Sequence, residues 1–201
     1  MIKTSLFHTA RYWIALCLLL WTPGAFFYWF IIHPLAGFWR RIGYGWGFLA
    51  GFGVMIATAV MMAFMRTQLL AIEFGTNPAV ILAGCAAIVI AFVIRRRRGK
   101  LLSFRTLMGF PELAPQKYPP KLLTEGIYGR IRHPRYAEVL VGLLGYALLS
   151  NYLAAYAAVL FAAAMISILI PIEERELRIR FGAEYDEYCR HVPALIPRLR
   201  T

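Results

Sequence analysis

Long runs of apolar residues alternate with charged segments along the chain. Uncharged runs cover residues 12–32, 43–65 and 78–94, which are 21, 23 and 17 residues long. A helix rises 1.5 Å per residue and the hydrocarbon core of a bilayer is about 30 Å thick, so runs of this length are typical of membrane-spanning helices. The pattern therefore predicts three spans within residues 1–94.

A fourth apolar run covers residues 137–172 and contains a single charge, Glu138. As one helix of 36 residues it would be about 54 Å long, far more than a bilayer requires. Its polar break is Ser150–Asn151, so we predict a tight helical hairpin that turns there. The chain is then an all-α polytopic membrane protein with about five transmembrane helices.

Composition supports a lipid environment and excludes an ordinary soluble or disordered protein. Hydrophobic residues make up 60% and charged residues 16%, whereas soluble domains average roughly 45–50% and about 25%. Cysteine and histidine spacings include no CxxC and no HExxH pattern, so no metal site is predicted.

Basic residues exceed acidic ones by 22 to 10, and seventeen of them lie in residues 95–135 and 173–201. No nucleic-acid-binding motif accompanies this charge, and we predict no nucleic-acid partner. Basic residues beside apolar spans indicate the cytosolic face. We expect a multi-pass protein of the bacterial inner membrane with a cytoplasmic C-terminus; the oligomeric state is left open.

These patterns divide one integral membrane domain, residues 1–201, into four parts. Three N-terminal spans (1–94) precede a cytosolic connector (95–136), the hairpin (137–172) and a cytosolic C-terminal segment (173–201). In that last segment, apolar residues at helical spacing predict an amphipathic surface helix with one buried stripe: Leu177, Phe181, Tyr185 and Tyr188.

Two polar clusters flank the predicted hairpin, residues 126–136 and 173–176. His133 and Glu173 are 40 residues apart and centred on Leu153, so each leg of about 20 residues rises about 30 Å. Both clusters should therefore meet at the cytosolic boundary and line a pocket with His, Arg, Tyr and carboxylate groups. S-adenosylmethionine (SAM), which carries a carboxylate, an amine, a ribose and a sulfonium, would suit such a pocket. The alternative is that these residues only anchor the helices and pair with each other.

The motif Gly-x-Tyr-x-x-x-Arg-His-Pro-x-Tyr at 126–136 is followed by the hairpin and by Glu-Glu-x-x-Leu-x-x-x-Phe-Gly-x-x-Tyr-x-x-Tyr from residue 173. Over residues 120–198 this order resembles the integral-membrane methyltransferases, which include isoprenylcysteine carboxyl methyltransferase and are akin to the phospholipid methyltransferases. The resemblance implies an enzyme that uses SAM as cofactor and methylates a lipophilic acceptor taken from the bilayer. It also implies these cofactor-binding residues: Lys121, Leu122, Leu123, Tyr128, His133, Pro134, Arg135, Tyr136, Glu173 and Glu174.

Two departures from the family pattern bear on the acceptor. Glu138 stands where the family often has Gly; we expect it either to pair with Arg135 or Arg132 or to contact the substrate. Glu138 and His133 are the candidate catalytic residues, needed as a base only if the acceptor must lose a proton. No Arg precedes the Glu pair in residues 168–172, where isoprenylcysteine methyltransferases carry one, so the acceptor and the methylated atom (oxygen, nitrogen or sulfur) stay open.

Two other functions are compatible with the sequence. A nicotinamide-dependent membrane reductase of the sterol reductase type would have a related C-terminal hairpin. A non-catalytic membrane protein that binds a lipid or a partner would keep the motif without its chemistry. Binding of SAM, of NADPH or of neither distinguishes the three.

Overall fold

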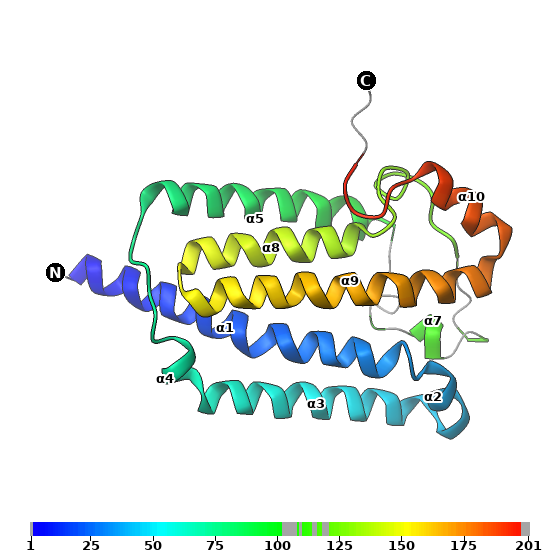
Figure 1. Ribbon diagram of the computed structural model, residues 1–201, viewed down its shortest axis with the longest axis horizontal. Coiled ribbons are helices and arrows are strands. Elements are labelled where there is room, and N and C mark those ends of the chain that lie inside the picture. The colour runs from blue at the N-terminus through cyan, green and yellow to red at the C-terminus, as the bar shows by residue number, and fades with distance from the viewer. Residues whose placement is uncertain (1, 102–107, 109, 114–115, 118–120, 198–201) are drawn as a thin grey trace.

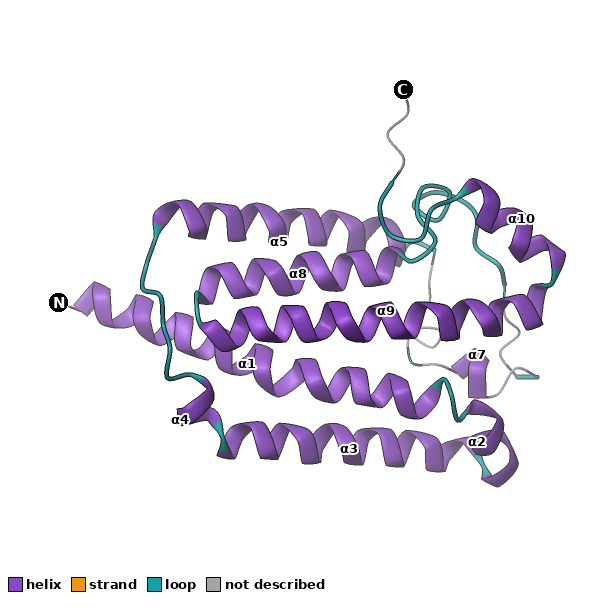
Figure 2. Ribbon diagram, viewed as in Figure 1, coloured by secondary structure: helices purple, strands orange, loops and turns teal. Residues whose placement is uncertain are grey.

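The computed structural model describes residues 2–101, 108, 110–113, 116–117 and 121–197. All regular structure in these residues is helical, with one isolated bridge between Glu73 and Tyr152 (Figure 2). The helices are α1 (Ile2–Ile32), α2 (Ala36–Ile42), α3 (Tyr44–Phe64), α4 (Arg66–Leu69), α5 (Pro78–Gly99), α7 (Phe110–Leu113), α8 (Pro134–Ser150), α9 (Leu153–Phe181) and α10 (Ala183–His191). Within the predicted connector, 95–136, residues 102–107, 109, 114–115 and 118–120 lie outside the described residues.

The five long helices run side by side along the long axis of the molecule (Figure 1). Helix α1 packs against α3, α8 and α9, and α5 packs along α8. One end of the bundle carries the N-terminus, α4 and the α8–α9 turn, and the other carries α2 and α10 (Figure 1). The two predicted polar clusters therefore lie at the same end, which we call the α10 end.

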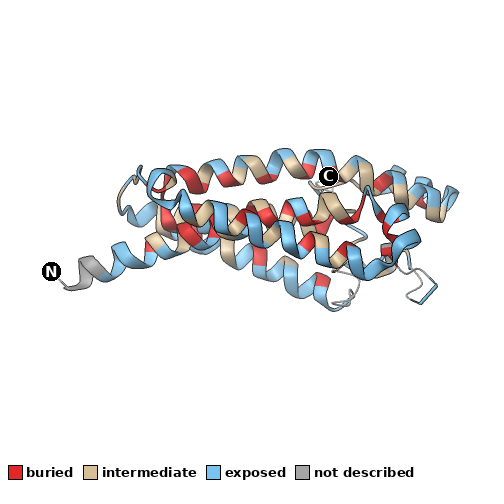
Figure 3. Ribbon diagram, turned by 90° about the horizontal axis from the view of Figure 1, so that it is seen from below, coloured by how far each residue is buried: buried red, intermediate tan, exposed pale blue. Residues whose placement is uncertain are grey.

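Four of these helices are long and apolar enough to cross a membrane: Leu6–Ile32, Tyr44–Phe64, Pro78–Gly99 and Leu153–Phe181. Large apolar side chains such as Trp21, Leu82 and Leu160 are more than 60% exposed, as expected for surfaces that face lipid. Figure 3 shows exposed positions recurring along the long helices, with buried positions between them. The chain is therefore an all-helical membrane protein.

The fifth predicted span is α8, which has 17 residues and forms the first leg of the hairpin. It ends at Ser150, and Asn151 takes a left-handed backbone conformation with φ 58° before α9 begins at Leu153. The predicted hairpin and the position of its turn are confirmed. Helix α9 is longer than predicted, because it continues past Ile172 to Phe181.

A polar cluster holds the hairpin turn against the loop that precedes α5. The Nη1 atom of Arg11 lies 2.6 Å from Glu73 Oε1, and its Nε donates to the carbonyl of Ser150 at 2.9 Å. Tyr152 Oη donates to Glu73 Oε2 at 3.1 Å. These contacts join helix α1, the loop before α5 and the hairpin turn at the end of the bundle opposite the α10 end.

Glycines allow the close approach of neighbouring helices. A Cβ atom on Gly51 of α3 would lie 2.6 Å from the Tyr28 ring of α1, and one on Gly47 would lie 2.9 Å from Trp39. Between α5 and α8, a Cβ on Gly84 or Gly145 would lie within 3.1 Å of the other glycine's carbonyl oxygen. Small residues at such contacts are typical of membrane helix pairs.

The predicted amphipathic helix of the C-terminal segment is divided in two. Gly182, with φ 56°, separates the end of α9 from α10, so the single surface helix expected here is wrong in its continuity. The predicted buried stripe is nevertheless present, because one apolar cluster contains Leu177, Phe181, Tyr185, Tyr188, Val192 and Leu122.

Candidate functional site

His133 and Pro134 begin helix α8 at the α10 end of the bundle. His133 is the residue before the first helical turn and Pro134 occupies its first position, where the missing N–H costs no hydrogen bond. The backbone N–H groups of Arg132 and His133 donate to the carbonyls of Pro193 and Ala194, both at 2.9 Å. The segment after α10 thus fixes the backbone of the motif.

Glu174 of α9 lies at the centre of a charged cluster with residues from the start of α8. His133 Nε2 lies 3.1 Å from Glu174 Oε1, and Arg132 donates to the same oxygen from Nε at 3.0 Å and from Nη2 at 2.6 Å. Arg178 approaches the other oxygen at 3.5 Å. Glu174 is only 8% exposed, and Arg132, His133 and Arg178 surround its carboxylate. Glu174 therefore holds Arg132 and His133 in place.

Arg132 also links this cluster to the C-terminal segment. Its Nη1 donates to the carbonyls of Val192 and Cys189. Burial by itself lowers the pKa of Arg132, but its hydrogen bonds and charge contact with Glu174 outweigh burial and raise the pKa above the ordinary value. The guanidinium is therefore a fixed positive charge that joins α9, α10 and the motif.

Glu173 precedes Glu174 but has a different environment. Its Oε2 lies 3.7 Å from His133 Nδ1, beyond the distance of a normal hydrogen bond, and its side chain is 31% exposed. Its carboxylate is therefore more accessible to a ligand than that of Glu174. Of the two carboxylates, Glu173 is the one with acceptor capacity to spare.

Tyr128 lies in the loop before α8. Tyr188 of α10 donates to its carbonyl at 2.6 Å, which ties this loop to the C-terminal segment. Burial raises the pKa of the Tyr128 phenol to about 12, with a smaller opposing effect from the charge of Arg98. The phenol is therefore neutral at physiological pH and keeps a hydroxyl donor.

Tyr136 and Arg135 extend from the first turn of α8. The Tyr136 ring stacks on His133, with 5.7 Å between ring centroids, and is buried. The Arg135 guanidinium lies over the Trp29 ring of α1, 4.1 Å from its centroid. A cation held this way over an aromatic face is stabilised and fixed in direction.

Trp29 of helix α1 and His33, the residue that follows α1, pack against these residues. The His33 ring stacks on Trp29 with 4.7 Å between centroids and 18° between planes. His33 Nδ1 lies 3.3 Å from Glu176 Oε2 of α9. Sequence analysis missed Trp29 and His33, and it placed Glu176 in the second polar cluster without a role. The four-residue spacing of Trp29 and His33, which places both on one helix face, was the available signal.

Glu138 pairs with Arg98 of α5. Arg98 Nε donates to Glu138 Oε2 at 2.9 Å and its Nη2 lies 2.8 Å from the same oxygen in an ion pair, so the expected pairing with Arg135 or Arg132 is wrong. Because α5 packs along α8, the last turn of α5 lies beside the second turn of α8. Arg98 is another residue that sequence analysis did not assign to the site.

The segment 121–123 lies against the C-terminal part of the chain. Leu122 packs into the apolar cluster of Tyr185, Tyr188 and Val192, Leu123 is half-buried and Lys121 is exposed. Their backbone contacts to a cofactor remain a prediction.

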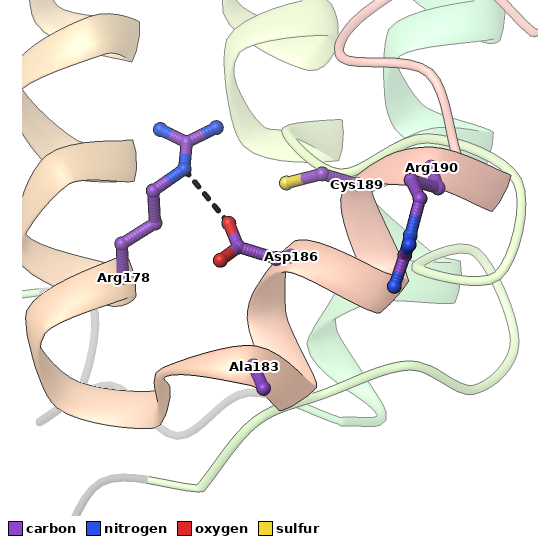
Figure 4. A pocket seen from close by; sticks show the side chains of 5 residues that line it. All are labelled: Arg178, Ala183, Asp186, Cys189 and Arg190. Carbon is purple, nitrogen blue, oxygen red and sulfur yellow. Dashed lines mark hydrogen bonds and ion pairs between the residues drawn. The ribbon is translucent and has the colours of Figure 1, made fainter.

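A shallow polar pocket lies between the end of α9 and α10 (Figure 4). Its lining residues are Arg178, Ala183, Asp186, Cys189 and Arg190, and Arg178 Nε donates to Asp186 Oδ1 at 3.1 Å. The pocket adjoins the charged cluster through Arg178, which also contacts Glu174. Within the described part of the chain, no group of three or more His, Cys, Asp or Glu side chains is arranged to hold a metal ion.

Comparison with known proteins places these residues in a family context. The curated relatives include a protein-S-isoprenylcysteine O-methyltransferase B from Arabidopsis thaliana, which is 37% identical over 78 residues. They also include a cobalt-zinc-cadmium resistance protein from Cupriavidus metallidurans, which is 40% identical over 79 residues. A probable protein-S-isoprenylcysteine O-methyltransferase from Oryza sativa subsp. indica is 40% identical over 78 residues. The matches cover 38% or 39% of this chain and only about two fifths of each relative (40%, 36% and 41%).

A family model described as phospholipid methyltransferase matches residues 79–184, which is more than half of the chain. The matched segment contains α8, α9, all of α5 after Pro78, and every motif residue from Tyr128 to Glu174. The chain therefore belongs to the phospholipid methyltransferase family.

Proposed function

We propose that the protein is an integral membrane methyltransferase that uses SAM and acts on a lipid-soluble acceptor. The observation that carries this proposal is the contact between the two motif halves: His133, at the start of α8, lies within 3.7 Å of Glu173 and 3.1 Å of Glu174 on α9. Family membership supports the same activity.

The donor and acceptor groups at the site fit SAM. Glu173 offers an accessible carboxylate to an amine or to ribose hydroxyls, and Arg135 offers a fixed cation to a carboxylate. The aromatic rings of Tyr128 and Tyr136 offer faces to the positively charged sulfonium of SAM. When bound, SAM supplies an electrophilic methyl group.

The remaining predicted residues have supporting roles in this proposal. Glu174 and Arg132 hold His133 and the loop of Tyr128 in register with α9 and α10. Pro134 begins α8, and the backbone of Lys121, Leu122 and Leu123 borders the cofactor. The protein's main contribution is to orient two reactants and exclude water.

The acceptor enters from the bilayer in this proposal, and the α10 end faces the cytosol of a bacterial inner membrane. Relatives named for isoprenylcysteine O-methylation favour an acceptor with an oxygen to methylate. A carboxylate acceptor needs no base. For an amine or thiol, His133 and Glu138 are the candidate bases. The nicotinamide reductase alternative has no support in the family match.

Thermal unfolding of the detergent-purified protein with SAM, with its demethylated product and with NADPH tests this proposal. SAM at a hundredfold excess over its dissociation constant should stabilise the protein by about 2.7 kcal/mol. Glu173→Gln should lose most of that stabilisation, whereas Glu187→Gln, at an exposed position of α10, should keep it. Stabilisation by NADPH alone would favour the reductase, and no stabilisation by any of the three would favour a non-catalytic role.

A further inference from the structure

Arg98 differs from the other members of its arginine run. Arg95, Arg96 and Arg97 are exposed, as expected for residues that anchor a span at the membrane surface. Arg98 is only 6% exposed and turns toward α8 to reach Glu138. An anchoring role accounts for the first three arginines but not for the burial of the fourth.

One donor group of Arg98 has no use within the fold. Its Nε donates to Glu138 Oε2 and its Nη2 lies 2.8 Å from the same oxygen, so both contacts orient the guanidinium. Its Nη1 is buried and has no hydrogen-bond partner among the described residues. Buried donors are nearly always satisfied, so an unsatisfied one beside the proposed site is a candidate for contact with a ligand.

The Arg98–Glu138 pair lies beside the proposed cofactor site. Glu138 follows His133 by five residues along α8, which is about 7.5 Å further from the α10 end. The pair is nevertheless close enough for its charges to act on Tyr128 and Arg135, residues of the cofactor set.

The charges of the site favour an anionic group beside Arg98. Arg98, Arg132 and Arg135 balance Glu138, Glu173 and Glu174, and Arg178, which contacts Glu174, is balanced by Asp186, so these eight side chains carry no net charge together. SAM, with two positive groups and one negative group, adds one positive charge. A carboxylate on the second reactant restores neutrality, and a phosphate oxygen places a negative charge beside Arg98 in a region of low dielectric, where unbalanced charge is costly.

We propose that Arg98 is a substrate-binding residue that donates from Nη1 to an anionic oxygen of the lipid-soluble acceptor, and that Glu138 is the positioning residue that fixes its guanidinium. This inference rests on the proposed function and adds a residue on α5, before the motif. The oxygen belongs either to the carboxylate of a prenylated cysteine or to the phosphate of a phospholipid.

The test uses two probes, N-acetyl-S-farnesyl-L-cysteine in detergent and phosphatidylethanolamine in nanodiscs. Methyl transfer from radiolabelled SAM and thermal stabilisation by each probe alone are measured for the full-length protein. The variants are Arg98→Met, the double variant Arg98→Met/Glu138→Met, and Arg97→Met as an exposed control. The double variant leaves no unpaired buried charge, so it should fold even if Arg98→Met does not.

We expect the wild type to use one of the two probes, which identifies the source of the oxygen. In the double variant the KM for that probe should rise by about tenfold or more, the loss expected for one charged hydrogen bond, while the SAM dissociation constant stays within about twofold. Arg97→Met should behave as the wild type.

Two results would overturn the inference and leave the proposed function standing. One is a double variant with the wild-type KM, which would make the pair a purely structural ion pair. The other is SAM binding by a wild type that neither binds nor methylates either probe. Failure of SAM to bind the wild type would instead reject the proposed function, and stabilisation by a probe alone would then test Arg98 separately.

Discussion

His133 Nε2 and Glu174 Oε1 lie 3.1 Å apart although 41 residues separate them in the chain. The contact closes the open end of the α8–α9 hairpin, and Arg132 reinforces it with two further hydrogen bonds to Glu174. The same few atoms therefore hold two transmembrane helices together and orient the histidine of the proposed cofactor site.

Glu174→Gln should destabilise the protein, because it leaves Arg132 without its carboxylate in a mostly buried position. Breaking one partner of such a pair costs about 3 kcal/mol of the free energy of unfolding. Thermal or denaturant unfolding in detergent measures the change. Glu187→Gln removes a carboxylate from an exposed ion pair on α10 and should change stability by less than about 1 kcal/mol. Equal effects of the two substitutions would contradict the central role of Glu174.

Trp29→Leu should weaken both the fold and SAM binding, because Trp29 lies between Arg135 and His33. Loss of the cation–π contact and the ring stacking should cost about 2 kcal/mol of stability. Trp21→Leu is the matched control on α1, since Trp21 is 63% exposed. SAM stabilisation that survives Trp29→Leu unchanged would show that Arg135 does not contact the cofactor.

Gly51→Ala should separate α1 from α3, since the added Cβ would lie 2.6 Å from the Tyr28 ring. Overpacking of this kind costs about 1–3 kcal/mol. Gly53 on the same helix has no atom within 4 Å of an added Cβ, so Gly53→Ala should be neutral or slightly stabilising. The difference in melting temperature between the two variants measures the contact, and similar melting temperatures would argue against the α1–α3 packing.

Cysteine labelling tests the orientation in the membrane. In a variant with Cys17, Cys85 and Cys189 replaced by Ser, Gln68→Cys and Lys100→Cys each add one exposed thiol at opposite ends of the bundle. A membrane-impermeant maleimide should label Gln68→Cys in intact spheroplasts and Lys100→Cys only after lysis. The reverse pattern would place the site outside the cytosol.

Local patterns predicted much of this fold. Uncharged runs predicted α1, α3 and α5, and Ser150–Asn151 predicted the hairpin turn. Burying a charge in lipid is costly, so spans are visible in the sequence as runs without charged residues. The equal length of the hairpin legs was enough to bring His133 to the Glu pair. Boundaries were less predictable: α9 runs past the end of the uninterrupted apolar run at Ile172 to Phe181, since a helix can leave the membrane without ending.

The partners of the site residues depended on contacts between distant helices. Glu138 pairs with Arg98 because α5 packs along α8, and the arginine run alone gave no indication of which member turns inward. Trp29 and His33 belong to a span that lies before the matched family segment. Their contribution follows from the packing of α1 against α8 and α9, which hydropathy does not determine.

The hairpin also sets when the site comes into existence during biogenesis. Arg132 and His133 are translated before α8, and Glu173 and Glu174 only after most of α9. The two halves meet only once both helices have entered the bilayer with opposite directions. A chain that stalls after α8, or remains outside the membrane, holds half a site. Insertion itself therefore acts as the maturation step, and the proposed chemistry is confined to correctly integrated molecules.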